Sequence, residues 1–513
     1  MRPVLLVKKW VLLTHRWTGI IFSLLFLAWF ISGIVLMYIE FPVLKPGERL
    51  KHMPVLDGSA IHVSPASAAD LAKIHNPEEI RLSSLLGRPA YHFRSGQKMT
   101  VIFADRAEVF HGLNETEAKQ IAANWLNQSI ALIHLEEKQV REDQWTVPQK
   151  YRPLRPLWKF EGADGQVVYV SDVTGEVVQH TDRVSRWGSY FGAIPHWVYF
   201  TKLRKDAAEW RLVVIWLSGA GTLMTLLGLA GGIWLYSPSK RYRFQTGPSS
   251  VPFAGQKRWH LILGFLFGVT TFTWVLSGMF SMTPIRWTPE TVETQVNRSL
   301  NAHADEASLQ EFSQHPPQWA LASLGSTLPT RELELTKIAG KYSYYAEGSS
   351  NQTALLDLDS SQARSVDPES IIAVVNRAIA PLAVIESHIV ISYDTYYVDR
   401  HNLKPLPALY IRLNDPNQCF FYIDLRNGRV AQSYGRAALW NRWLYHGLHS
   451  FDLPWLYRTR PVWDILVISL MLGGIALSVT GCIIAVRRLN RRVIKPLQNG
   501  SLRKTFIRSR PTE

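Results

Sequence analysis

Four long stretches without a charged side chain constrain the fold of this chain more than any other feature. They are Trp17–Ile39, Leu212–Tyr236, His260–Thr283 and Ile465–Val486. Each is longer than the ~20 apolar residues with which an α-helix crosses the ~30 Å hydrocarbon core of a bilayer. The sequence therefore predicts an α-helical integral membrane protein with four transmembrane helices.

The basic side chains of the chain are concentrated next to these stretches. Residues 1–10, 237–259 and 487–513 hold three, five and nine Lys or Arg side chains against one acid, within a formal net charge of +15. Basic segments that flank transmembrane helices stay in the cytoplasm. We therefore interpret the charge as a sign of topology, with anionic lipid as a secondary partner, and not as a nucleic-acid-binding surface.

This topology predicts the organisation of the whole chain. Both termini and the middle loop are expected in the cytoplasm, and two large domains on the opposite side. The apolar run near the N-terminus is too long for a signal peptide, and no small-residue cleavage site follows it closely, so we expect an uncleaved anchor. The expected parts are the N-terminus with helix 1 (1–39), outer domain 1 (40–211), helix 2 (212–236), the cytoplasmic loop (237–259), helix 3 (260–283), outer domain 2 (284–464), helix 4 (465–486) and the cytoplasmic tail (487–513).

Several classes of protein are disfavoured by what the sequence contains. Cys419 and Cys482 fall in an outer domain and a membrane helix, so no disulfide is expected between them. The sequence has no CxxCH motif for covalent haem, no GxGxxG motif and no P-loop. No acid or lysine stands in the middle of a predicted span, which argues against an ion-coupled transporter.

The sequence also predicts an internal duplication. The pattern H-x3-G-x2-F-x6-W-x2-S-G-x3-M begins at His15 and again at His260, 245 residues later. Helices 2 and 4 match at an offset of 253, and the outer domains match at 252, where Asp172 falls on Asp424. A helix is expected before each matched hairpin, at 114–128 and at 368–380, the latter with Asp367 as N-cap and Pro368 at its first position. Each half thus reads helix, outer α+β domain, helix, which makes the repeats parallel.

Two pairs of histidines stand at matched depths of this arrangement. His15 and His260 follow basic segments on the cytoplasmic side, and His196 and His449 precede helices 2 and 4 on the outer side. Gly19 and Gly264 each follow a histidine of the first pair by four residues, on the same helix face. A histidine beside a bare patch of helix suits a flat macrocycle, because imidazole ligates the iron and the missing side chain leaves room for the ring. We therefore predict two b-type haems, each held by two histidines.

Other assignments of these residues stay open. His446 is one turn from His449 and competes with it as the outer ligand. Arg16, beside His15, suits a haem propionate, as do Arg186, Arg258 and Arg442. The histidines also fit a role as polar anchors at the membrane interface, with Gly and Trp as packing residues. A closed zinc site is disfavoured, because no Asp, Glu or Cys accompanies either pair.

The sequence resembles the PepSY-associated transmembrane family of bacterial inner membranes, which is often linked to iron uptake. The resemblance rests on "LTHRWTGIIFSLLFLAWFISG", on the hairpins "VYVSDVTGEVV" and "FYIDLRNGRVA", and on "WLYHGLHSFDLPW". It implies two extracytoplasmic PepSY-like domains on the four helices. Family members of the FoxB type are haem-containing reductases of ferric siderophores, so the resemblance implies a cytoplasmic-side haem on His15 and His260 and an outer-side haem on His196 and His449. The second hairpin has Arg426-Asn427-Gly428-Arg429 in place of the usual TGEV turn, so the two domains need not do the same job.

The function that we predict is transmembrane electron transfer. Electrons from a quinol or a cytoplasmic reductase would pass through the two haems to a ferric siderophore, and Fe(II), which the oxygen ligands hold less tightly, would be released. The expected residues that line the substrate site are Trp443, Tyr445, Trp455 and Arg458. The alternative is a membrane-anchored PepSY binding or inhibitory module without redox activity.

Overall fold

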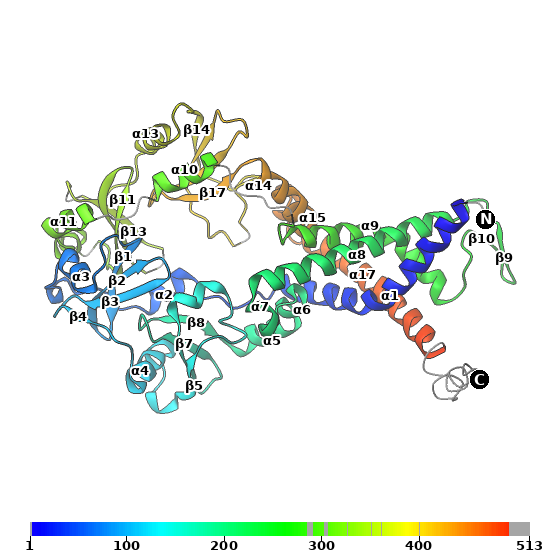
Figure 1. Ribbon diagram of the computed structural model, residues 1–513, viewed down its shortest axis with the longest axis horizontal. Helices are drawn as coiled ribbons and strands as arrows, with labels where there is room; N and C mark the ends of the chain where they lie inside the picture. Colours follow the sequence, from blue (N-terminus) through cyan, green and yellow to red (C-terminus); the bar gives the residue numbers. More distant parts are fainter. Residues whose placement is uncertain are drawn as a thin grey trace, which may run out of the picture. The chain divides into compact units, whose positions relative to one another are not determined.

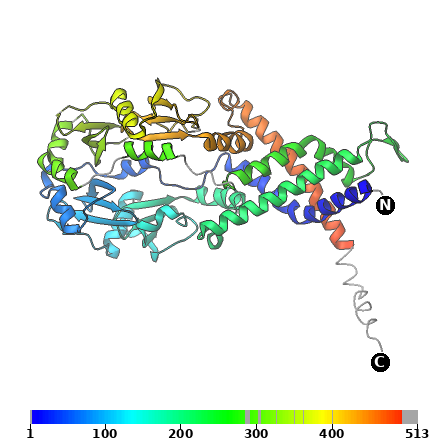
Figure 2. The same cartoon turned by 45° about the horizontal axis from the view of Figure 1, so that its top comes forward.

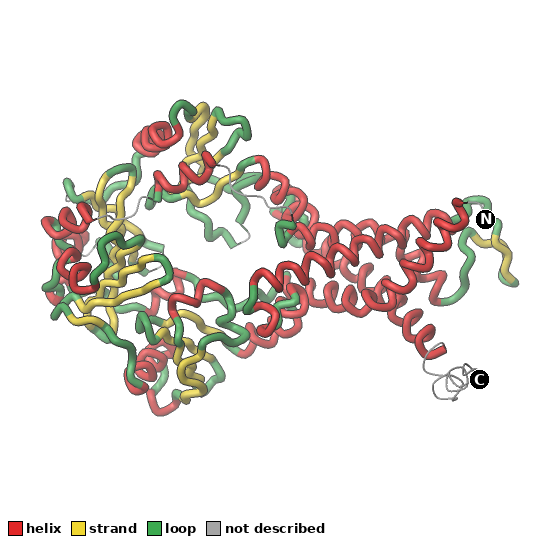
Figure 3. The backbone as a smooth tube through the Cα atoms, viewed as in Figure 1, coloured by secondary structure: helices red, strands yellow, loops and turns green. Residues whose placement is uncertain are grey.

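The computed structural model divides into two units. It describes residues 3–284, 291–301, 306–325, 327–349, 351–360, 362–399 and 401–491. The helical unit comprises Met1–Phe41, Gly188–Arg286 and Asn441–Glu513, and the β-sheet unit comprises Pro42–Trp187 and Trp287–Trp440. In Figure 3, where helices are red and strands yellow, the helical unit is mostly red and the β-sheet unit holds most of the yellow strands.

Four helices of the helical unit are long and apolar enough to cross a membrane, as the sequence predicts. They are α1 (Pro3–Leu36), α8 (Ala207–Leu235), α9 (Gln256–Phe280) and α17 (Val462–Leu489), with mean hydropathies of 2.5, 2.0, 1.8 and 2.2. Helices α1 and α9 each pack against both α8 and α17, and the four lie side by side in two views (Figure 1 and Figure 2). α1 and α9 therefore face each other diagonally across a four-helix bundle.

Aromatic rings fill the middle of this bundle, and glycines on neighbouring helices leave room for them. Phe22, Phe26, Phe30 and Trp274 belong to its buried apolar cluster. A Cβ at Gly221 would lie 3.0 Å from the ring of Phe26, so the glycine lets α8 approach α1 closely. Small residues at such contacts are typical of packed membrane helices.

The β-sheet unit is built around one antiparallel sheet of seven strands. Its order is β13-β12-β11-β1-β2-β3-β4, so the two long outer segments of the sequence contribute strands to the same sheet. β1 and β11 are neighbours, with Leu82 opposite Leu333. The strands are β1 (Glu79–Leu85), β2 (Arg88–Ser95), β3 (Lys98–Phe103), β4 (Glu108–Val109), β11 (Glu332–Ile338), β12 (Lys341–Glu347) and β13 (Thr353–Asp357).

Two four-stranded antiparallel sheets complete this unit, each with its strands in sequence order. The first is β5 (His134–Val140), β6 (Leu157–Glu161), β7 (Val167–Ser171) and β8 (Val177–Thr181). The second is β14 (Val384–Val390), β15 (Ala408–Leu413), β16 (Phe420–Asp424) and β17 (Val430–Tyr434). The helices expected before them are confirmed as α4 (Glu115–Leu126) and α13 (Pro368–Ile379), and Asp367 accepts hydrogen bonds at the N-cap of α13.

The cross-strand register changes the alignment of these two sheets. Tyr169 lies opposite Gln179, and Tyr422 lies opposite Gln432, so the last two strands of each sheet correspond at an offset of 253. Ser171, and not Asp172, therefore corresponds to Asp424. The strands β6 and β15 correspond at 251, because the turn between β15 and β16 is two residues longer than its counterpart. The offset of 252 taken from the sequence lies between these two values.

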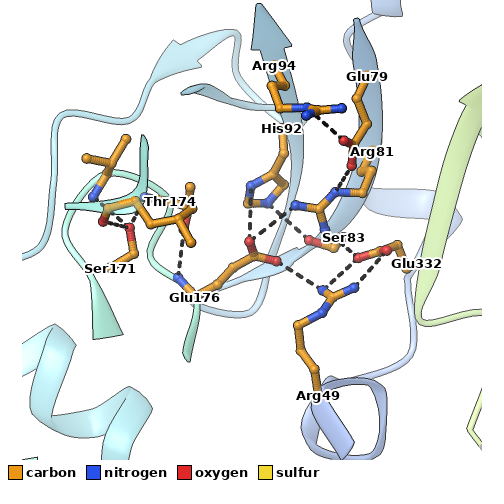
Figure 4. Close-up of polar contacts among 12 residues, drawn as sticks. Arg49, Glu79, Arg81, Ser83, His92, Arg94, Ser171, Thr174, Glu176 and Glu332 are labelled. Carbon is orange, nitrogen blue, oxygen red and sulfur yellow. Dashed lines mark hydrogen bonds and ion pairs between the residues drawn. The ribbon is translucent and has the colours of Figure 1, made fainter. Parts of the chain in front are cut away.

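A cluster of buried charges lies where β1 and β11 meet (Figure 4). Arg81 is 2.7 Å from a carboxylate oxygen of Glu332 and 3.4 Å from one of Glu176. Arg49 is 2.7 Å from Glu332 and 3.2 Å from Glu176. Burial raises the pKa of Glu176, but the charges of Arg81, His92 and Arg49 outweigh it and hold this pKa well below its usual range. The carboxylates of Glu176 and Glu332 are therefore ionised at neutral pH.

Shorter elements connect these parts. In the helical unit, or at its boundary, they are α5 (Arg183–Phe191), α6 (Ala193–Trp197), α7 (Thr201–Arg204), β9 (Tyr242–Phe244), β10 (Gly247–Ser249), α14 (Arg436–Asn441), the π-helix η4 (Arg442–Gly447), α15 (Leu448–Ser450) and α16 (Pro454–Tyr457). In the β-sheet unit they are α2 (Pro46–His52), η1 (Gly58–Ala60), α3 (Pro65–Ala72), η2 (Ile130–Leu132), η3 (Gln149–Leu154), α10 (Thr291–Leu300), α11 (Glu306–Gln314) and α12 (Pro317–Leu324).

Candidate functional site

The structure brings the four matched histidines together as two pairs. His15 on α1 and His260 on α9 face each other across the bundle, with 6.3 Å between ring centroids and 35° between ring planes. We call them the inner pair. His196 on α6 and His449 on α15 form the outer pair, with 5.9 Å between centroids and 61° between planes.

Helices α8 and α17 hold the inner pair in place. Nδ1 of His15 lies 2.9 Å from the carbonyl oxygen of Met224 on α8. Nδ1 of His260 lies 3.0 Å from the hydroxyl of Thr480 on α17, and this hydroxyl donates to the carbonyl of Leu477 at 2.7 Å. Leu477 stands 253 residues after Met224, and its carbonyl also interacts with His260, so Thr480 adds a hydroxyl to the carbonyl contact that corresponds to the partner of His15.

Each inner histidine also packs against a glycine of the neighbouring helix. A Cβ at Gly228 would lie 2.5 Å from Cε1 of His15, and a Cβ at Gly481 would lie 3.6 Å from Cε1 of His260. Real Cβ contacts below about 3 Å require something to move, so Gly228 is the tighter of the two. The glycines leave the space that the imidazole rings occupy.

The outer pair rests on the same short pattern of α1 and α9. Nδ1 of His196 lies 3.1 Å from the carbonyl of Trp29 and 3.3 Å from the hydroxyl of Ser32. Nδ1 of His449 lies 3.1 Å from the carbonyl of Trp274 and 3.1 Å from the hydroxyl of Ser277. The W-x2-S-G pattern of each long helix therefore provides both acceptors.

The backbone beside the outer histidines is constrained in the same way in both places. Val198 and Phe451, two residues after His196 and His449, have positive φ angles of 54° and 49°. This left-handed conformation is uncommon, above all for a β-branched residue such as valine. The same uncommon backbone conformation follows both histidines, which indicates that the chain is held in a defined turn at each of them.

The geometry of both pairs fits ligation of one metal centre between two imidazoles. Two rings that bind one ion from opposite sides through bonds of ~2 Å have centroids about 6 Å apart, close to the separations observed. All four Nδ1 atoms contact a carbonyl or hydroxyl oxygen, and ligating histidines characteristically engage one ring nitrogen in this way while the other binds metal. No group of three or more His, Cys, Asp or Glu side chains arranged for a metal ion occurs among the described residues. Each pair thus offers two protein ligands, which suits a metal whose other ligands belong to a macrocycle.

The comparison with known families agrees with the sequence motifs. A family model described as "PepSY-associated TM region" matches residues 12–488. The chain belongs to this family. The match includes both histidine pairs and both outer segments. No curated protein matches the chain.

Gly19 and Gly264, which we expect to lie against a macrocycle in this PepSY-associated protein, have open surroundings. A Cβ at Gly19 or at Gly264 would have no heavy atom within 4 Å. Each glycine lies one turn from a histidine of the inner pair, on the face that the sequence predicts for a ring. Arg16 is exposed, as is Arg258, and their contact with propionates stays a prediction.

The other candidate ligand, His446, lies apart from the pairing geometry. It is His449 whose ring makes an edge-to-face contact with that of His196. His446 is on the π-helix η4, its side chain is 47% exposed, and its Nδ1 is 3.8 Å from Asp452. The ring of Tyr445 contacts both histidine rings, with centroid separations of 4.6 Å from His446 and 5.4 Å from His449.

The residues expected to line a substrate site lie on η4, on α16 and at the C-cap of α16, close in sequence to His449. The side chains of Trp443 and Trp455 are 37% and 71% exposed, and Arg458 is exposed. Tyr445 lies beside His449. Arg442 is buried and donates a hydrogen bond to the carbonyl of Asp452 at 2.6 Å, which gives it a structural role here. Arg186 bonds to Thr181 and to the carbonyl of Gly165 in the β-sheet unit.

Several residues of the site were not predicted as functional. Ser32 and Ser277 were part of the repeated pattern, and Gly228 and Gly481 were matched positions of helices 2 and 4, so a signal for them was present. Thr480 has no counterpart in the first half, where Leu227 stands. Its role depends on a tertiary contact that the sequence pattern does not contain.

Proposed function

We propose that this protein is a membrane oxidoreductase that moves electrons through its helical bundle and reduces a ferric siderophore on the outer side. The observation that carries the proposal is the presence of two histidine pairs whose Nδ1 atoms are all engaged and whose rings face each other. A haem bound between the rings of each pair would supply reversible one-electron chemistry without an open iron position. The protein residues hold and orient the imidazoles and exclude water from the bundle.

The spacing of the two pairs supports transfer across a membrane. Trp29 follows His15 by 14 residues on α1, and Trp274 follows His260 by 14 residues on α9. The carbonyls of these tryptophans hold the outer pair, so the two pairs lie about 21 Å apart at 1.5 Å of rise per residue. This distance fits within the ~30 Å hydrocarbon core. Stacked Phe26 and Trp29, 5.8 Å apart, belong to the apolar packing between the pairs.

We further propose that the two halves arose by duplication and that the protein lies in a bacterial inner membrane with cytoplasmic termini and periplasmic PepSY-like domains. The matched sheets, registers and histidine contacts support the duplication. The basic segments support the orientation, because Arg487 and Arg488 stand in the last turn of α17 and positive residues remain on the cytoplasmic side. The inner pair then faces the electron donor, a quinol or a cytoplasmic reductase.

The substrate follows from the chemistry of iron release. Oxygen-rich siderophores bind the hard Fe(III) ion far better than Fe(II), so one electron loosens the metal. Trp443, Tyr445, Trp455 and Arg458, next to His449, are the residues that we expect to contact the ferric complex. Trp443, Trp455 and Arg458 are exposed, and a guanidinium suits an anionic, oxygen-rich complex.

The first test is the visible spectrum of the detergent-purified protein, oxidised and reduced with dithionite, together with the haem-to-protein ratio. We expect sharp reduced b-type bands and about two haems per chain. His15→Ala is expected to remove one haem and spare the other, and ferric siderophore is expected to reoxidise the reduced protein. A protein that stays colourless when it is expressed with ample haem would contradict the proposal and favour a membrane-anchored PepSY binding module.

A further inference from the structure

The outer and inner pairs differ in the acceptors that their Nδ1 atoms meet. Each outer histidine lies within hydrogen-bond distance of both a carbonyl and a serine hydroxyl, at 3.1 and 3.3 Å for His196 and at 3.1 and 3.1 Å for His449. His260 likewise has a hydroxyl, that of Thr480, and a carbonyl, that of Leu477, within reach. Among the described residues, His15 meets only the carbonyl of Met224. The outer pair therefore has one more hydroxyl acceptor at its Nδ1 atoms than the inner pair.

The direction of the serine hydrogen bonds follows from their second contact. Ser32 donates its hydroxyl proton to the carbonyl of Trp29 at 3.1 Å, and Ser277 donates to the carbonyl of Trp274 at 3.0 Å. The oxygen lone pairs are left to accept from Nδ1–H of the imidazole. When the other ring nitrogen binds metal, Nδ1 carries the proton, so this direction is required. Each Nδ1–H is then shared between a carbonyl and a hydroxyl.

Burial makes these contacts specific. Ser32 and Ser277 are 1% and 0% exposed. A buried hydroxyl without a partner is costly, and here both the proton and the lone pairs of the hydroxyl are used. The same arrangement occurs on α1 and α9, which places one serine on each side of the outer pair.

We propose that Ser32 and Ser277 are positioning residues that orient the outer histidines and give the outer haem a lower reduction potential than the inner one. The inference rests on the proposed function, because it concerns the iron that His196 and His449 would ligate. An acceptor on Nδ1–H makes an imidazole a more basic ligand. A more basic ligand favours Fe(III) over Fe(II), and second-shell hydrogen bonding is one of the levers on haem potential. A low potential at the outer end suits a substrate whose ligands strongly favour Fe(III).

The test is a spectroelectrochemical titration of the full-length, detergent-purified protein. Its variants are Ser32→Ala and Ser277→Ala, singly and together. The wave of the outer haem is assigned with His196→Ala, which leaves the inner pair intact. Ser478→Ala is the matched control, because this buried serine bonds to Gly474 in its own helix and not to a histidine. Thr480→Val provides the corresponding change at the inner pair.

We expect each serine variant to raise the outer potential, the double variant to raise it further, and the inner wave to stay in place. A tenfold change in the Fe(III)/Fe(II) equilibrium corresponds to about 59 mV for a one-electron couple, and the double variant is expected to reach about this size. The electron paramagnetic resonance spectrum of the ferric outer haem should also change, since it depends on the angle between the rings. Thr480→Val should move only the inner wave, and Ser478→Ala neither.

Three results are distinguishable from this pattern. Full haem content with unchanged potentials in both serine variants would overturn the inference while the proposed function stands. Loss of the outer haem from both single variants would assign the serines to binding and not to tuning, which also overturns it. A wild-type protein without haem would instead overturn the proposed function.

Discussion

Arg81 and Glu334 lie directly opposite each other across β1 and β11, and they stand 253 residues apart in the sequence. This is the offset at which the last strands of the two smaller sheets correspond. Arg81 and Glu334 are therefore both cross-strand neighbours and equivalent positions of the two halves, which places the pseudo-twofold axis of the seven-stranded sheet between them. The two residues have opposite charge. Arg94 and Glu347 show the same exchange, as do Glu176 and Arg429.

The exchanged charges form equivalent ion pairs in the two halves. Arg81 pairs with Glu176 at 3.4 Å, and Glu334 pairs with Arg429. The same contact is thus made twice with its charges reversed. Arg81 also bonds to Glu332 of the other half at 2.7 Å, so the cluster ties β1 to β11. If the two halves were identical in sequence, two like charges would face each other between β1 and β11. The opposite charges at these positions therefore favour pairing of the first half with the second half of one chain.

Replacing Arg81 by Met should destabilise the β-sheet unit severely. The side chain is only 14% exposed, and its removal leaves Glu176 and Glu332 with less compensating charge. Loss of one partner of a buried ion pair costs about 3–5 kcal/mol. Chemical denaturation followed by the fluorescence of the β-sheet unit would measure this change. Lys138→Met is the matched control, because its pair with Glu115 is exposed on both sides, at 53% and 49%, and should contribute about 1 kcal/mol or less. An equal effect of the two changes would refute the role assigned to the cluster.

Glu347 should make the stability of the β-sheet unit fall as pH rises. Burial, and after it the charge of Glu332, raises the pKa of Glu347 to about 7. Between the unfolded value of 4.5 and this folded value, the folded protein keeps a proton that the unfolded chain has lost. The free energy of unfolding therefore decreases with pH in this window, by up to about 3 kcal/mol at 1.36 kcal/mol per unit. In Glu347→Gln this slope should become shallower, while burial, which also raises the pKa of Glu334, leaves a smaller decrease of the same sign. Melting temperatures recorded from pH 5 to 8 would show it.

The acids of the buried charge cluster, such as Glu332, make the free energy of unfolding rise with pH. Their contribution can therefore be separated from the decrease that Glu347 causes. The pKa of Glu332 is lowered, since the charges of Arg81 and Arg49 outweigh the effect of burial. A depressed carboxylate pKa contributes stability that is present above the unfolded value and lost in acid. Glu347→Gln should leave this acid loss intact. A variant that retained the full decrease of the unaltered protein between pH 5 and 7 would contradict the assignment to Glu347.

The sequence predicted the helices well because membrane spans depend on composition over a long window. The four uncharged stretches became four apolar helices, although α1 begins at Pro3 and not at residue 17. The N-cap Asp367 and the helix after it were also predicted, since capping is local chemistry. The matched histidines came from repetition along the chain, which is why they pair in space.

The features that the sequence did not predict depend on contacts between segments that are distant along the chain. Nothing local shows that strands from both outer segments join one sheet, because the β1–β11 pairing connects residues about 250 positions apart in sequence. The partners Met224 and Thr480 could not be predicted for the same reason. The sequence matched His449 to His196 and left His446 as a competitor, and the two differ in the structure because the turn at Phe451 presents His449 to α9.

Gly228→Ala should disrupt the inner pair selectively. The added Cβ would lie 2.5 Å from Cε1 and 2.9 Å from Nδ1 of His15, so the ring must move and its bond to Met224 must weaken. We expect the loss of one haem, with the outer haem retained. Gly219→Ala on the same helix is the control, since its Cβ would meet only Met279 at 3.5 Å. Haem quantification with the reduced spectrum would measure both, and two haems in Gly228→Ala would contradict the geometry.

Gly264→Leu should separate helix packing from cofactor space. In the protein chain alone the position is open, with no heavy atom within 4 Å of a Cβ. The substitution should therefore leave the melting temperature of the haem-free protein unchanged. If a haem occupies the space beside His260, the same substitution should lower the content of the inner haem. Gly19→Leu is expected to behave in the same way on α1. Full haem content in both variants would show that the ring lies elsewhere.

The final prediction distinguishes the two neighbouring histidines of the outer site. His449→Ala removes a ring 5.9 Å from that of His196, together with the hydrogen bonds to Trp274 and Ser277. We expect it to abolish the outer haem and to prevent reoxidation by ferric siderophore, while the inner haem remains reducible. His446→Ala changes a half-exposed side chain near Asp452, and both haems should persist. Reduced spectra of the two variants decide between them: an intact dihaem spectrum in His449→Ala, with a haem lost in His446→Ala, would transfer the ligand role to His446.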